Sequence, residues 1–473
     1  MGEPGPGGHA DLAPPGLTEP RRRARKNPGG VAMELHRRNV LGLGGLAALA
    51  TALTPALSGC SSTLPEADVT AAGFGEDATG TVRLWCRAAT VVGVRQVVDA
   101  FNASQDEVTV EVTPVLDGQY VTKLATAIRG GNVPDIVDID DINSMLFIYR
   151  DSFTDLTPLV EQLDFADRLN PGQLGLATRD GRNYGVPYIA DNSALFYNTE
   201  LFERAGLDPV EHTRDLPGML EAARAIGALG DGTYGWSIDG NAAGILGFVV
   251  QPHIWAADAP NVVGEVGEQR GSMADNDAVR RTFEFYRTMW AEKLLPQANF
   301  SGDGARWGAD FRDGTVGMFP SNFSVAVLNA SEEMQAKTGV VLLPGPDGGR
   351  ATFAGGDNLC IPRGAPNASG AWRFARFALD LPQQQNLPAG GYIPVRSDAA
   401  TPEYREKYPL AVAPLDGIEG AYAPTTLAYN LLFNQQDSPW IAAFRRAVFD
   451  GDLDGALTQG QKDFDRILEQ AQL

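Results

Sequence analysis

Cysteine is scarce in this chain of 473 residues, which contains only Cys60, Cys86 and Cys360. Three thiols cannot build the disulfide framework that stabilises many small secreted domains. Cys86 and Cys360 each lie in a short apolar run, where a small buried thiol is typical. We expect two separate buried thiols, and a single disulfide between them is the alternative.

Histidine is almost as rare: the chain has four, and only His212 and His253 follow Cys60. No His/Cys cluster has the spacing of a zinc site, and the scarcity of histidine disfavours a catalytic triad that uses histidine as its base. The sequence after Cys60 also lacks a GxSxG elbow, an HExxH helix and a P-loop. We therefore predict no metal, no cofactor and no enzymatic activity.

Basic residues are fewer than acidic ones: the chain has 38 Lys and Arg and 59 Asp and Glu, which gives a net charge of −21. Nucleic-acid phosphates are neutralised by clustered Lys and Arg, so we expect no nucleic-acid partner. Removal of residues 1–59, with seven Lys/Arg and four Asp/Glu, would leave 414 residues and a net charge of −24. That length is enough for two lobes, and the charge favours a soluble monomer.

The N-terminal region has the order of an export signal. Arg37 and Arg38 precede an apolar segment over 40–57, and small residues lead to Cys60. The arginine pair resembles a twin-arginine signal, and the four residues ending at Cys60 resemble a bacterial lipobox. We expect residues 1–59 to be a leader with a cleaved signal peptide, and a lipid on Cys60 to hold the protein at the extracellular face of the membrane. A transmembrane anchor is the alternative, which the short, Gly/Ala-rich segment disfavours.

The segments that flank this signal are of low complexity. Residues 1–32 are rich in Pro and Gly and do not fit an export signal, so we expect translation to start at Met33. A disordered basic arm that begins at Met1 is the alternative. Residues 60–79 are small, polar and acidic without periodicity, and we expect them to form a flexible tether.

From Gly80 onward, strand and helix patterns alternate. The first five fall on residues 82–85, 91–102, 108–112, 120–128 and 134–139. Such alternation predicts an α/β fold with parallel sheets and helices on both faces, whose ligands gather at the carboxyl ends of the strands. Asp140 and Asp141 follow the last of these strands and are candidate ligand contacts, with a solvated turn as the alternative.

Seven short motifs follow one another along the chain. They are PDIV at 134–137, GVPY at 185–188, LFYN at 195–198, FRDGTVGM at 311–318, LPGPDG at 343–348, GGDN at 355–358 and GYIPVR at 391–396. Their order and spacing resemble the extracellular solute-binding proteins of ABC importers, family 1, the carbohydrate-binding group. The resemblance implies a two-lobed periplasmic-binding-protein-like fold with crossing hinge strands, which closes on a carbohydrate and delivers it to the ABC permease.

The resemblance also implies where the chain passes between lobes. We expect crossings near residues 188–194, 353–358 and 392–397, where extended segments marked by Gly or Pro interrupt the helical pattern. The expected lobes are residues 80–190 with 357–392, and residues 193–354 with 395–473.

A sugar has apolar C–H faces and a rim of hydroxyls, so its site needs aromatic surfaces and fixed polar groups. Asp191 and Asn192 interrupt a strand pattern at a place where the resembled family has cleft contacts, with a turn-stabilising role as the alternative. Trp236 and Trp255 lie in loop-like sequence and are candidate stacking platforms, Trp255 the stronger. Ordinary packing is the alternative for both.

The chain departs from the resembled pattern after FRDGTVGM, where the family usually has Gly, Ser and Trp. This chain has Ser321, Asn322 and Phe323, so a large stacking surface is replaced and an amide is added. We expect Ser321 and Asn322 to contact a smaller or more polar ligand.

Two later motifs supply the remaining candidates. Gly356 permits close backbone approach beside Asp357, and both are expected at the ligand. Arg396 is expected to bind vicinal hydroxyls or a carboxylate, with an interlobe salt bridge as the alternative.

The predicted function is thus a lipid-anchored extracellular receptor that captures a carbohydrate by hinge closure. A secreted glycoside hydrolase with paired carboxylates is the first alternative. An acidic cell-surface interaction protein is the second. The sequence identifies neither the sugar nor the permease.

Overall fold

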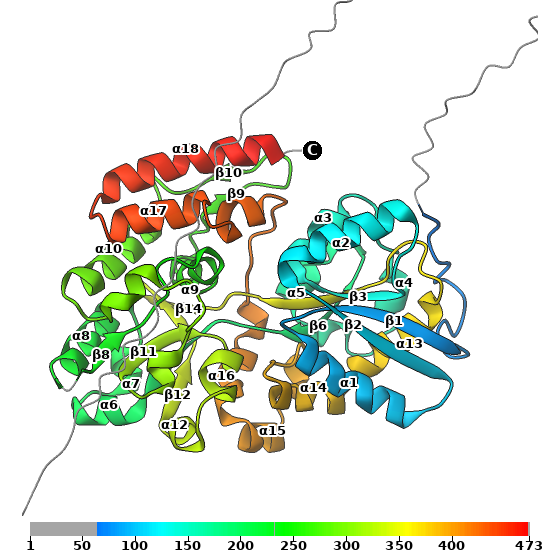
Figure 1. Cartoon of the computed structure of the whole chain (residues 1–473), viewed down its shortest axis with the longest axis horizontal. Coiled ribbons are helices and arrows are strands. Elements are labelled where there is room, and N and C mark those ends of the chain that lie inside the picture. The colour runs from blue at the N-terminus through cyan, green and yellow to red at the C-terminus, as the bar shows by residue number, and fades with distance from the viewer. Residues whose placement is uncertain (1–63, 231, 472–473) are drawn as a thin grey trace, which may run out of the picture. The chain divides into compact units, whose positions relative to one another are not determined.

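The computed structural model describes residues 64–230 and 232–471 (Figure 1). The predictions for the leader, the start site and Cys60 lie outside these residues. Two larger sheets, of five and four strands, organise the described part of the chain. Within it, no helix has both the length and the apolar character needed to cross a membrane.

The five-stranded sheet has the strand order β2-β1-β3-β15-β6. Its strands are β1 (Gly80–Arg87), β2 (Val108–Val115), β3 (Ile136–Asp140), β6 (Val186–Ala190) and β15 (Gly356–Cys360). β1 runs parallel to β2 and β3, as predicted, but β15 runs antiparallel to β3 and β6. The prediction of parallel sheets therefore holds for β1, β2 and β3 and is wrong for β15. The chain enters β15 directly from the region of the second sheet. No crossover helix returns it to the other end of the first sheet, so β15 does not take the parallel direction.

Helices cover this sheet, and the first two of them coincide with the helical patterns predicted at residues 91–102 and 120–128. They are α1 (Val91–Ser104), α2 (Asp117–Gly130), α3 (Asp141–Ile148) and α13 (Ala368–Ala378). The four α1 side chains at helical spacing, Val94, Val97, Val98 and Phe101, are all buried. Gly131 caps the end of α2, and its φ of 67° is a left-handed conformation that glycine adopts without strain.

The four-stranded sheet has the order β12-β7-β11-β8. Its strands are β7 (Ala194–Asn198), β8 (Tyr234–Trp236), β11 (Val316–Ser321) and β12 (Thr338–Val341). β7 is antiparallel to both β11 and β12, whereas β11 runs parallel to β8, so this sheet is also mixed. The longer helices in this half are α8 (Leu216–Gly227), α9 (Ala243–Trp255), α10 (Asp277–Ala291), α17 (Pro439–Val448) and α18 (Leu453–Ala471).

Shorter elements connect these layers. The short helices are α4 (Thr157–Val160), α5 (Pro171–Leu176), α6 (Thr199–Arg204), α7 (Pro209–His212), α11 (Ala309–Arg312), α12 (Glu332–Ala336), α14 (Leu381–Asn386), α15 (Pro402–Lys407), α16 (Val412–Asp416) and the π-helix η8 (Asn430–Asn434). The short strands form three hairpins, β4 (Thr178–Arg179) with β5 (Arg182–Asn183), β9 (Val262–Val263) with β10 (Arg270–Gly271), and β13 (Leu343–Gly345) with β14 (Gly348–Ala351).

Three extended segments lie side by side between the two sheets. Ala190 is the register partner of Gly356 and also forms an isolated bridge with Ile393. One residue further on, the Asp191 amide donates to the Gly355 carbonyl at 2.8 Å. These are the segments for which we predicted crossings. A later segment also pairs here, since Tyr422 bridges to Phe353. The lobe boundaries remain a prediction.

Residues 64–79 differ from the flexible tether that we predicted. Val69 is buried, and the Pro65 carbonyl accepts a hydrogen bond from the Gly364 amide at 2.8 Å. The Glu66 carboxylate also pairs with Arg363 at 3.0 Å. This part of the segment packs against the five-stranded half because it carries an apolar side chain and a charge partner despite its low complexity.

The two cysteines that the structure describes are separate, as predicted. Cys86 on β1 and Cys360 on β15 are buried free thiols. Burial raises the pKa of Cys86 to about 12, so this thiol stays protonated and unreactive.

Candidate ligand-binding site

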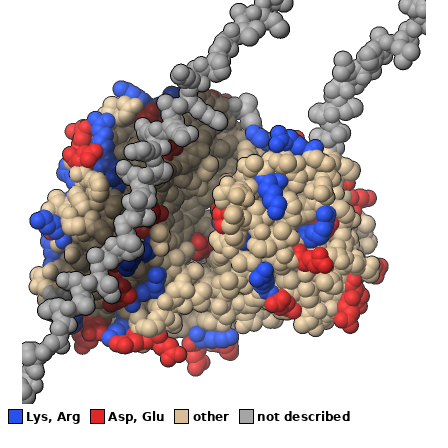
Figure 2. All heavy atoms as spheres, viewed as in Figure 1, with Lys and Arg blue, Asp and Glu red and all other residues tan. Residues whose placement is uncertain are grey.

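A cavity of about 610 Å³ is lined by residues from both sheet regions. One wall comes from the carboxyl ends of β1 and β3 with the starts of α2 and α3. The other comes from α9, η8 and the loops around Trp307 and Phe353. Figure 2 shows the surface hollowed between these two halves, with acidic atoms at its margin. Strand ends are where an α/β sheet gathers ligand contacts.

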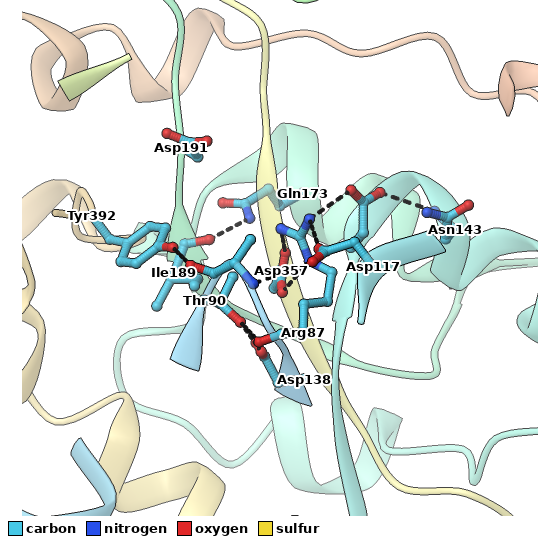
Figure 3. Close-up of polar contacts among 12 residues, drawn as sticks. Arg87, Thr90, Asp117, Asp138, Asn143, Gln173, Ile189, Asp191, Asp357 and Tyr392 are labelled. Carbon is cyan, nitrogen blue, oxygen red and sulfur yellow. Dashed lines mark hydrogen bonds and ion pairs between the residues drawn. The ribbon is translucent and has the colours of Figure 1, made fainter. Parts of the chain in front are cut away.

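Arg87, at the end of β1, is the centre of the polar wall (Figure 3). Its guanidinium binds Asp357 through two nitrogens, one of them Nε at 2.8 Å from Oδ2. Its Nη1 lies 3.4 Å from carboxylate oxygens of both Asp117 and Asp140. The two-pronged contact fixes the guanidinium plane. Asp117 starts α2, is half-exposed and lines the cavity, and its second oxygen accepts the Ala89 amide at 3.3 Å.

Asp140 and Asp141 sit where β3 passes into α3. Asp140 caps α3 by accepting the Asn143 amide at 3.3 Å, and both aspartates line the cavity. Burial raises the pKa of Asp140, and the nearby Arg87 opposes that rise. Burial raises the pKa of Asp141 well above its ordinary value, and the charge of Asp140 adds to the rise. The sequence prediction placed both correctly at a strand end, and both lie at the cavity.

Asp191 lies in the link between β6 and β7. Its Oδ2 accepts the Asn322 side-chain amide at 3.0 Å, and both residues line the cavity. Burial raises the pKa of Asp191 to about 6, although the hydrogen bond from Asn322 opposes the rise. The pair brings together two residues that the sequence proposed separately, one from the first crossing segment and one from the end of β11.

The second wall is aromatic. Phe248 on α9 contacts Trp307 edge-on, with ring centroids 6.3 Å apart, and Phe353 with centroids 5.3 Å apart. Phe353 in turn meets Tyr429 at 6.0 Å. All four rings line the cavity, and Phe248 and Trp307 are partly exposed. Such a surface can pack against the C–H face of a ring ligand.

The two tryptophans chosen from the sequence lie outside this wall, and the loops expected around them are wrong. Trp236 is on strand β8, fully buried against Phe285 and Tyr286 at centroid distances of 5.4 and 5.9 Å. Trp255 ends helix α9 and packs behind Phe353 at 5.6 Å. Both are core residues here, so packing, the alternative reading, describes their place.

Three polar candidates also lie outside the lining of the cavity. Asn192 is buried and donates to the Pro414 carbonyl at 3.1 Å. Ser321 is buried at the end of β11, opposite Ala194. Arg396 pairs with its near neighbour Asp398 at 2.6 Å, so the contact is not the interlobe salt bridge considered as its alternative. None of the three lines the cavity.

Gly356 and Asp357, the first two residues of β15, stabilise the site. Gly356 has a φ of 140°, and a Cβ there would lie 2.1 Å from the Ile189 carbonyl oxygen. Glycine is required because two extended segments meet at this point. Asp357 is fully buried under Arg87 and orients it, so we infer a positioning role in place of ligand contact.

Sequence reasoning missed Arg87 and the whole aromatic wall. Arg87 ends the first strand, so its place at a carboxyl end was a usable signal. Phe248 lies in the apolar helix α9 and Tyr429 directly precedes η8, and the sequences around both residues resemble core. Only the pairing of distant segments brings these rings to one surface.

Comparison with known proteins places the chain in a family. Residues 96–413 match the family described as bacterial extracellular solute-binding protein, and the chain belongs to it. It is similar to the diacetylchitobiose binding protein DasA of Streptomyces coelicolor, with 24% identity over 279 residues, covering 58% of this chain and 63% of that protein.

Solved structures agree on the fold. The sugar-binding protein MalE of Xanthomonas citri superposes with a TM-score of 0.69 at 22% identity, covering 83% of this chain and 98% of that one. UgpB of Mycobacterium tuberculosis, solved with glycerophosphocholine, gives a TM-score of 0.67 at 20% identity, covering 83% and 99%. The predicted two-lobed α/β solute-binding fold is confirmed. The named relatives are binding proteins, which at the level of the family supports the expectation of a non-enzyme.

Proposed function

We propose that this protein is the receptor of an ABC sugar importer. It captures a carbohydrate in the cavity between its two lobes and delivers it to the permease. Family membership supports solute binding, and the names of DasA and MalE support a sugar as the solute.

The observation that carries the proposal is the two-sided cavity. Phe248, Trp307 and Phe353 offer an apolar face, while Asp140 and Asp117 offer acceptors for hydroxyl groups. A carbohydrate presents these two kinds of surface at once. A phosphodiester fits less well, because Arg87, the obvious anion ligand, is already bound by Asp357.

Hinge closure follows from the same arrangement. A ligand favours the closed state only to the extent that it gains contacts there, and these two walls come from different halves of the protein. The linked segments at Ala190, Gly355 and Ile393 are the natural place for the change in backbone angle. The closed form is then the one that the permease recognises.

A lipid on Cys60 completes the proposal. It rests on the lipobox-like sequence alone, and it would keep the receptor at the outer face of the membrane beside its permease. Replacement of Cys60 by Ala in the producing cell tests it. We expect the protein to move from the membrane fraction to the medium, and unchanged membrane retention would contradict the anchor.

A thermal-shift screen against mono- and oligosaccharides tests the binding function, with chromatography of each hit after incubation. We expect at least one sugar to raise the melting temperature and to be recovered intact. Recovery of cleaved sugar would favour the glycoside hydrolase. No shift with any sugar, together with a shift by glycerophosphocholine, would contradict the carbohydrate assignment.

A further inference from the structure

The cavity has an imbalance of charge. Among the described residues that line it, Arg87 is the only basic one. Its carboxyl groups are those of Asp117, Asp140, Asp141 and Asp191. The aromatic wall contributes no charged side chain. Since Arg87 is bound to the buried Asp357, its single charge is shared with a further carboxylate beneath the wall.

Asp141 is the least compensated of these groups. The residue is 1% exposed, and neither carboxylate oxygen has a partner at hydrogen-bond geometry among the described residues. The neighbouring Ile142 amide offsets only part of the burial, and the Asn143 amide is taken by Asp140. A buried carboxylate without a partner is costly, so its retention at a cavity wall points to a donor that arrives with the ligand.

We propose that the ligand is an amino sugar, whose protonated amine is bound by Asp141 with Asp140 while the sugar ring packs on the aromatic wall. The inference rests on the proposed function and specifies its substrate. An ammonium group supplies both the missing positive charge and several N–H donors, whereas a hydroxyl supplies one donor and no charge.

Two other cations fit less well. A bare metal ion would need a set of ligands close together, and no group of three or more His, Cys, Asp or Glu in residues 64–230 and 232–471 could hold one. A quaternary ammonium group has no N–H, so it would leave the Asp141 oxygens without donors. The unpaired oxygens therefore select an amine with hydrogen to donate.

Matched sugars test the proposal by calorimetric titration at neutral pH. The panel holds glucose, galactose and mannose with their 2-amino and 2-acetamido derivatives, and cellobiose with chitobiose and diacetylchitobiose. We expect at least one amine to bind tenfold or more tightly than both its hydroxyl parent and its N-acetyl derivative. Hydroxyl or N-acetyl sugars that bind as well as the amines would overturn the inference and leave the proposed function standing. No binding by any sugar would overturn both.

The variant Asp141→Asn separates ligand recognition from structure. We expect the ratio of amine affinity to hydroxyl affinity to fall at least tenfold, and the ligand-free protein to melt at the same or a higher temperature, because a buried carboxyl group without a hydrogen-bond partner is removed. The exposed Asp106→Asn serves as the matched control, with no change in the ratio. An unchanged ratio in Asp141→Asn, or a marked fall in its melting temperature, would contradict the assignment.

Discussion

The side-chain amide of Asn322 donates to the carboxylate of Asp191 at 3.0 Å, so the end of β11 is tied to the link between β6 and β7. Both residues line the cavity, and neither is adjacent to the other in sequence. The hydrogen bond joins the link between β6 and β7 to the half of the protein that carries the aromatic wall. A change at either residue should therefore affect stability and binding together.

The raised pKa of Asp191 predicts a pH dependence. A carboxyl group that binds its proton more tightly when folded stabilises the fold as the pH falls through about 6, until it levels off near the unfolded value of about 4. We expect the difference in unfolding free energy between wild type and Asp191→Asn to change across this window. Urea titrations at several pH values measure it, and a constant difference would contradict the shift.

The difference between the two proteins is the proper measure because other groups titrate nearby. Burial lowers the pKa of His253 to about 4, so this histidine destabilises the fold as the pH falls below about 6.5. That effect opposes the effect of Asp191. It is present in both proteins and cancels in the difference.

Substitution of Trp307 should lower sugar affinity, whereas substitution of Trp236 should lower stability. Trp307→Ala removes a partly exposed ring of the cavity wall, so we expect about a tenfold loss of sugar affinity, on the order of 1.4 kcal/mol. Trp236→Ala removes a ring from the core and should lower the unfolding free energy by about 3–5 kcal/mol with little change in affinity. Calorimetry and urea unfolding of both variants check the contrast, and a reversed pattern would restore Trp236 as the platform.

Breaking the Arg87–Asp357 pair should be costly. Arg87→Met would leave Asp357 fully buried without its cation, with an expected loss of about 3–5 kcal/mol in unfolding free energy. The double variant with Asp357→Asn should recover part of that loss. The exposed pair Arg446–Asp452 offers a control, since Arg446→Met should change stability little. Equal losses of unfolding free energy in Arg87→Met and Arg446→Met would show that the buried pair contributes no more to stability than the exposed pair.

Gly356 should tolerate no side chain. Gly356→Ala combines a left-handed φ with a Cβ that would meet the Ile189 carbonyl, and we expect a loss of at least about 2 kcal/mol. Gly175→Ala is the matched control, because a Cβ there meets nothing within 4 Å. Thermal or urea unfolding measures both, and a near-neutral Gly356→Ala would contradict the close approach.

Local patterns predicted much of the fold. The periodicity of residues 91–102 identified a helix and its buried face, and the alternation at 108–112 identified β2. The direction of β15 could not be predicted, because it depends on where the chain returns from the second half. α9 was missed since it holds Pro252 and is apolar on all sides, so it shows no periodic face.

The site was predicted only in part, for a related reason. Asp140, Asp141 and Asp191 stand where a strand ends, which is a local signal, and they reach the cavity. Trp236 was chosen because glycine and polar residues flank it, yet the strand pairing of β8 takes it into the core. Long-range pairing decides which aromatic rings face the ligand, and a single sequence does not show that pairing.

The most direct test of the central claim is a crystal structure of the protein with the sugar that stabilises it most. We predict one intact sugar in the 610 Å³ cavity, with its apolar face on Phe248 and Trp307 and its polar groups on Asp140 and Asp141. A sugar bound elsewhere, or one that contacts only one of the two walls, would contradict it.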